Sequence, residues 1–143
     1  MMRRILAVTA ATLMSLFGVA LVASPAHAGS AHFVDDQLSV TRDGDTLTAA
    51  GKVAGLGSEP QVRVVLTATA SCINPGDNKP RAANKQSLSV EAVFPVQDGK
   101  AYFILSVTAA VDPSSPCPDP MVIVFSGVSV TAAGDTVVVP GTF

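Results

Sequence analysis

The chain has 143 residues, with nine lysines and arginines against eleven aspartates and glutamates, and a formal net charge of −2. This mildly acidic balance offers no basic stripe for nucleic acid. The chain has two cysteines, two histidines and no tryptophan. The spacing of the cysteines and histidines matches no zinc motif. We therefore expect no nucleic-acid partner, no metal site and no cofactor.

Residues 1–28 have the three parts of a signal peptide. Met1-Met2-Arg3-Arg4 gives a positive start, 5–22 is an uncharged apolar run, and Ala26-x-Ala28 is the small-residue pattern that signal peptidase recognises. An apolar run of this length could also just span a bilayer, but Pro25 and the cleavage pattern favour removal. The sequence thus predicts a secreted, extracellular protein that contacts the membrane only through its signal peptide before cleavage.

Cleavage after Ala28 would leave residues 29–143, which have a typical length for one domain. A chain of this length buries roughly two-thirds of its unfolded surface. Loss of Arg3 and Arg4 leaves seven basic and eleven acidic side chains, for a net charge of −4. We expect a single acidic domain with a genuine hydrophobic core.

The mature part shows repeated alternation of apolar and polar residues, which is typical of half-buried strands, and no convincing helical periodicity. Strands are predicted at 38–42 and 46–54, separated by Asp43-Gly44-Asp45. The clearest alternation is at 61–72, where the inward face is Val62, Val64, Leu66, Ala68, Ala70 and Cys72.

Further strands are predicted at 87–96, 100–111, 121–131 and 136–139. Asp98-Gly99 indicates a tight hairpin between the first two, and Pro95 indicates a strand that lies at an edge or is distorted at that point. A phase change at Ser126-Gly127 indicates a bulge. Seven or eight short strands predict an all-β fold, a single antiparallel immunoglobulin-like β-sandwich.

Cys72 and Cys117 are expected to form one disulfide in an oxidising compartment; the alternative is two separate buried thiols. If the strand at 61–72 runs up, both cysteines lie at the same end of the sandwich. The bridge closes a loop of about 46 residues, worth roughly 4 kcal/mol in the chain-entropy model. An immunoglobulin disulfide joins mid-strand cysteines over a tryptophan, so this bridge is expected to join loops instead.

The connection at 73–85 is the candidate ligand-binding loop. Its polar and charged candidates are Asn74, Asp77, Lys79, Arg81 and Lys85. Three of the seven mature basic residues fall within seven positions here, which would suit an anionic ligand or a polysaccharide. The alternative is a solvated loop whose charges keep this end soluble.

The connection at 112–120, DPSSPCPDP, has four prolines in nine residues. Proline fixes φ and reduces the freedom of the loop. A stiff exposed loop anchored by Cys117 resembles the loops with which substrate-like protease inhibitors bind without an ordering cost. The alternative is that the prolines only block edge-to-edge pairing.

Catalytic and calcium sites are not expected. Histidine-dependent catalysis would have to use His32, which lies beside the mature terminus in no motif. The aspartates at 35, 36, 43 and 45 provide oxygen ligands, but their spacing matches no calcium loop. We expect that the protein is not an enzyme.

Several stretches resemble a family of small secreted actinobacterial proteins of uncharacterised function. They are CINPGDNKP at 72–80, AANKQ at 82–86, the Cys-Pro pair at 117–118 and the tail VPGTF at 139–143. The resemblance covers most of the mature chain. It implies an exported β-domain and carries over no catalytic residues.

These observations predict a secreted, non-enzymatic β-sandwich that acts as a binding or surface-associated module through the loop at 73–85. Its partner would be a cell-wall component, an extracellular protein or a glycan. The alternative is a secreted protease inhibitor acting through the loop at 112–120.

Overall fold

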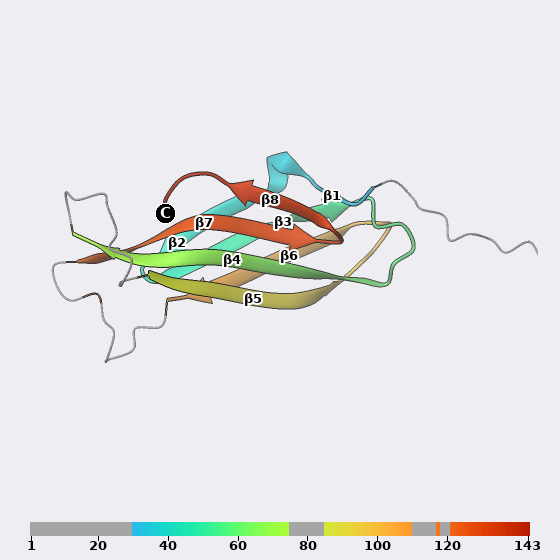
Figure 1. The fold of residues 1–143 in the computed structure, drawn as a ribbon. Coiled ribbons are helices and arrows are strands. Elements are labelled where there is room, and N and C mark those ends of the chain that lie inside the picture. The colour runs from blue at the N-terminus through green and yellow to red at the C-terminus, as the bar shows by residue number, and fades with distance from the viewer. Residues whose placement is uncertain (1–29, 75–84, 110–116, 118–120) are drawn as a thin grey trace, which may run out of the picture.

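The computed structural model describes residues 30–74, 85–109, 117 and 121–143. They form two antiparallel β-sheets packed face to face (Figure 1), which confirms an all-β sandwich. The helical element among these residues is a single 3₁₀ turn, Asp35–Gln37. Within this part of the chain, no helix is long and apolar enough to cross a membrane.

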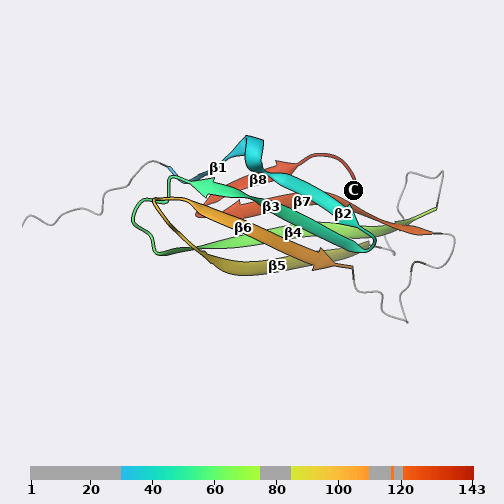
Figure 2. The same ribbon diagram turned by 180° about the vertical axis from the view of Figure 1, so that it is seen from behind.

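The first sheet is centred on β3 (Thr46–Ala54). One edge of β3 pairs with β1 (His32–Phe33) and β2 (Ser39–Asp43), and the other pairs with β6 (Ala101–Thr108). All three pairings are antiparallel, and Figure 2 shows this sheet in front. The turn between β2 and β3 falls at the predicted Asp43-Gly44-Asp45.

The second sheet has the order β5-β4-β7-β8. Its strands are β4 (Gln61–Ile73), β5 (Lys85–Pro95), β7 (Val122–Ala132) and β8 (Asp135–Val139). Because β5 is at the edge of this sheet, Pro95 needs no ladder partner on its open side. The edge position predicted from Pro95 is confirmed.

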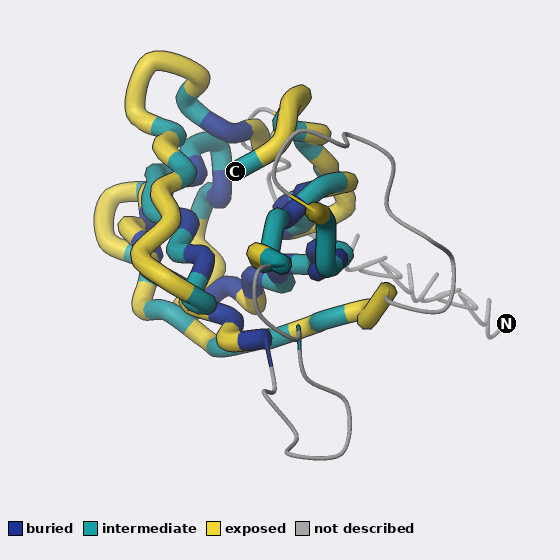
Figure 3. Tube along the Cα trace, turned by 90° about the vertical axis from the view of Figure 1, so that its left-hand side faces the viewer, coloured by how far each residue is buried: buried dark blue, intermediate teal, exposed yellow. Residues whose placement is uncertain are grey.

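The core lies between the sheets and is built from the alternating inward side chains. Along β4, Val62, Val64, Leu66, Ala68 and Ala70 are buried, as the pattern predicts. Figure 3 shows buried and exposed segments alternating along both layers. The largest fully buried side chains are Phe125, Leu47, Leu66, Val53, Val64, Val128 and Val130.

The predicted bulge in β7 is present. Thr67 pairs with Ser129 while Thr69 pairs with Ser126, so two residues of β7 oppose one of β4. Gly127 has φ +57°, which a glycine adopts without a Cβ penalty. The bulge brings both Phe125 and Val128 into the core despite their opposite parity.

The Asp98-Gly99 turn is confirmed, but the hairpin predicted around it is wrong beyond the turn. Gln97 and Lys100 form one bridge, and the central residues have φ +52° and +72°. Beyond this bridge the two strands do not pair with each other, because β5 pairs with β4 and β6 pairs with β3. Each strand obtains a full ladder with a strand of its own sheet, so the segment at 96–100 crosses from one sheet to the other.

Replacing Leu66 with alanine should lower the free energy of unfolding by about 2–5 kcal/mol, because its side chain is fully buried in the core. Urea unfolding measures this loss. Val138→Ala is the control, since Val138 is 67% exposed and its truncation should change stability by less than about 0.5 kcal/mol. Equal losses in the two variants would contradict the assigned core.

Candidate functional site

Cys72, the second-last residue of strand β4, is joined to Cys117 by a disulfide with a Cα–Cα distance of 5.4 Å. This distance is ordinary for a disulfide, and the predicted pairing is confirmed. The expectation that the bridge joins two loops is wrong for Cys72, which lies within β4. The bridge fixes Cys117 beside the end of a 13-residue strand. Cys117 is therefore covalently anchored to the second sheet.

Several chain segments meet at this end of the sandwich, which we call the bridged end: 71–74, 85–87, 117, 122–124 and the β2–β3 turn. Ile73 pairs with Val122 and Ser71 pairs with Lys85, so β4 ends where β5 and β7 begin. In the other sheet, Ala109 N donates to Asp45 O at 2.8 Å, which ties the end of β6 to the turn. The end of β4 and the starts of β5 and β7 lie on the left of Figure 1. The disulfide places Cys117 at this same end, as the strand directions predicted.

Two of the five candidate residues of the ligand loop lie in the described part of the chain. Asn74 and Lys85 are both exposed, at the end of β4 and the start of β5. Asp77, Lys79 and Arg81 lie outside the described residues, as does the loop at 112–120 apart from Cys117. The structure thus brings both ends of the ligand loop to the bridged end, beside the disulfide.

Ser71 is a polar residue of this end that the sequence pattern did not single out. The alternation assigns it to the outer face, yet it is only 2% exposed. Its hydroxyl has no hydrogen-bond partner among the described residues. A buried hydroxyl without a partner costs about 1–3 kcal/mol, so the bridged end has an unused hydrogen-bonding group next to Cys72.

The outer faces of the sheets carry paired hydroxyls. Thr67 and Ser129 lie 2.6 Å apart and Thr131 and Thr136 lie 2.9 Å apart on the second sheet. On the first sheet, Thr48 lies 2.8 Å from Ser106. A hollow of about 250 Å³ beside the bulge is lined by Thr67, Ala68, Thr69, Ser87, Leu88, Ser89 and Gly127. These parts of the outer faces are thus rich in hydroxyl groups.

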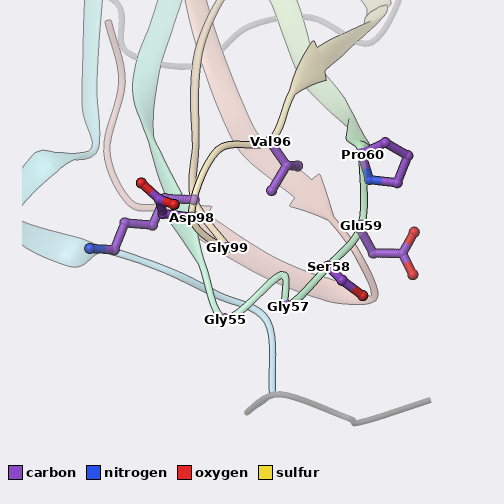
Figure 4. A pocket seen from close by; sticks show the side chains of 9 residues that line it. Gly55, Gly57, Ser58, Glu59, Pro60, Val96, Asp98 and Gly99 are labelled. Carbon is purple, nitrogen blue, oxygen red and sulfur yellow. The ribbon is translucent and has the colours of Figure 1, made fainter.

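A larger hollow of about 520 Å³ lies at the opposite end, between the two segments that cross from sheet to sheet (Figure 4). The segments are joined by hydrogen bonds from Leu56 N to Gly99 O and from Val96 N to Pro60 O. Gly57, Ser58, Glu59 and Asp98 are among its lining residues. Most of the residues that line this hollow are ordinary turn residues in the sequence. They come together only because the chain crosses between the two sheets at both segments.

The described residues contain no group of three or more histidine, cysteine, aspartate or glutamate side chains placed to hold a metal ion. His32 is exposed, and its Nδ1 lies 3.0 Å from the carbonyl oxygen of Ser30. Arg63 and Glu91 form an ion pair at 3.6 Å, with both side chains at least 60% exposed. Exposed pairs of this kind add little to stability.

Comparisons with protein-family models, with curated proteins and with solved structures find no match. The resemblance to small secreted actinobacterial proteins and the immunoglobulin-like assignment therefore stay predictions.

Replacing both Cys72 and Cys117 with serine should lower the free energy of unfolding by about 4 kcal/mol, because the unfolded chain gains the freedom of a 45-residue separation. Urea unfolding of the oxidised protein and the double variant measures the loss. The oxidised protein exposed to a reductant is the matched control and should lose the same amount. Unchanged stability in both would contradict a constraining role for the bridge.

Proposed function

We propose that the protein is a secreted, non-enzymatic binding module that holds a cell-wall glycan or another extracellular polymer at its bridged end. The observation that carries this proposal is the Cys72–Cys117 disulfide, which fixes Cys117 beside the end of β4, where the candidate ligand loop begins. Binding residues are often placed on loops that a rigid scaffold positions. Here the two packed sheets supply the scaffold, and the disulfide holds Cys117 next to the end of β4.

The disulfide supports the proposed extracellular location of the protein. Disulfides persist in oxidising compartments outside the cell, and the signal peptide predicted at 1–28 provides the export route. Both support a secreted protein.

Charge supports an anionic or polar ligand. The mature chain is expected to be acidic, yet Lys79, Arg81 and Lys85 concentrate positive charge in the ligand loop. Such a local cluster attracts an anionic polymer over about 8–10 Å at physiological ionic strength. Asn74, which is exposed at the end of β4, adds a hydrogen-bonding side chain at the base of the loop.

Reversing the charge of Lys79, Arg81 and Lys85 to glutamate should abolish retention of the oxidised protein on cell-wall or glycan fractions. The measurement is a pull-down with quantitation of bound protein at several salt concentrations. The wild-type protein should be released as salt rises, because screening weakens the attraction of the loop for an anionic polymer.

The matched control reverses Lys52, Arg63 and Lys100, which changes the net charge equally but lies outside the bridged end. This variant should retain its binding. Equal loss of binding in both triple variants would show that net charge, and not the ligand loop, is responsible. Full retention by the loop variant would contradict the proposal.

The alternative function, inhibition of a secreted protease through the loop at 112–120, is supported by the anchoring of Cys117. The same pull-down from culture medium distinguishes the two functions. An inhibitor would retain a serine protease through a loop that resists cleavage, and the charge reversal in the ligand loop would leave this binding intact.

A further inference from the structure

Strand β6 forms one edge of the first sheet. It pairs with β3 from Ala101 to Thr108, and no other strand in the described part of the chain joins this sheet on the far side of β6. An edge strand presents a row of backbone N–H and C=O groups that can pair with another chain.

The other edge strands carry features that discourage such pairing. Strand β5 contains Pro95 and charged Glu91, β2 ends in Arg42 and Asp43, and the short β8 begins with Asp135. The sequence of β6, AYFILSVT, has no charge, no proline and no glycine. Among these edges, β6 is the one without a protective residue.

Two of the four outward side chains of β6 are large hydrophobic residues. Tyr102 is 67% exposed and Ile104 is 64% exposed. The ammonium of Lys52, on the neighbouring β3, lies 5.2 Å from the centre of the Tyr102 ring, a favourable cation–π distance. Tyr102 and Ile104 thus form a small exposed hydrophobic patch beside the open backbone edge of β6.

We propose that β6 pairs antiparallel with β6 of a second copy of this chain, with Ile104 at the two-fold axis. In this register Ile104 faces its own copy and Tyr102 faces Ser106. Tyr102 also lies diagonal to Ile104 of the other copy, within reach of an aromatic side chain. The pairing joins two four-stranded sheets into one continuous sheet.

A second copy fits this edge because the edge is complementary to itself. A two-fold interface sets the same strand against itself, and the lack of charge on β6 means that no like charges meet. Phe103 and Leu105 point into the core of their own copy. A slip of one residue would set these positions opposite the outward row, so burial restricts the pairing to registers that set outward residues against outward residues.

The pairing leaves the bridged end free. Tyr102 and Ile104 lie on the half of β6 that follows the Asp98-Gly99 turn, whereas Thr108 and Ala109 reach the bridged end. Because the paired strands run in opposite directions, the two bridged ends of a dimer would point away from each other. This proposal does not depend on the ligand of the bridged end.

The test is analytical ultracentrifugation of the protein expressed as the full chain in an exporting host and recovered oxidised, from about 1 µM to about 1 mM. The wild-type protein should shift from monomer to dimer over this range. Ile104→Lys should raise the dissociation constant at least tenfold, because two ammonium groups then meet at the axis. Hydrogen exchange in 101–108 should slow as the concentration of the wild-type protein rises.

Val138→Lys is the matched control, since Val138 is 67% exposed on β8, and it should dimerise like the wild type. Tyr102→Lys repeats the test if Ile104→Lys proves unstable. A monomer at every concentration, even one that binds an extended peptide of another protein, would overturn the proposal. So would association that persists in Ile104→Lys or that Val138→Lys weakens equally.

Discussion

Strand β4 connects the core of the molecule to its candidate site. It pairs with β5 along residues 61–71 and with β7 from Val64 to Ile73, apart from the bulge. Its inward side chains fill the centre of the sandwich, and Cys72 is its second-last residue. Because successive side chains alternate between faces, the same register sets both the burial of Leu66 and the position of the disulfide.

The bridged end owes its composition to this strand. The β4–β5 and β4–β7 ladders bring Lys85 and Val122 beside the end of β4, and the disulfide adds Cys117. Segments that lie tens of residues apart in the sequence thus share one end of a rigid scaffold. The opposite end is built differently, by two crossing segments joined through backbone hydrogen bonds.

The sequence predicted the parts of the fold that depend on local patterns. Alternation identified β4 with its inward face and also identified β6, and the parity change at Gly127 identified the bulge, because each of these patterns lies within one strand. The two-residue β1 escaped prediction because so short a strand has no measurable period. The separation of β5 from β6 also escaped prediction, since Asp98-Gly99 specifies a turn but not which strands pair beyond it.

The candidate site was predictable to the same extent. Two cysteines in a chain predicted to be exported indicated the disulfide, and the predicted strand directions indicated that both cysteines lie at the same end of the sandwich. The burial of Ser71 could not be predicted from its alternating position, because it depends on tertiary packing at the end of β4. The open edge of β6 likewise depends on strand order, which the sequence did not specify.

Binding at the bridged end is the central claim, and hydrogen exchange with and without a cell-wall glycan fraction tests it most directly. The oxidised protein should show slower exchange at 71–74, 85–87 and 122–124 when the fraction is added, and unchanged exchange at 55–60 and 97–100. Protection confined to the crossing segments at 55–60 and 97–100 would place the ligand at the opposite end and contradict the account.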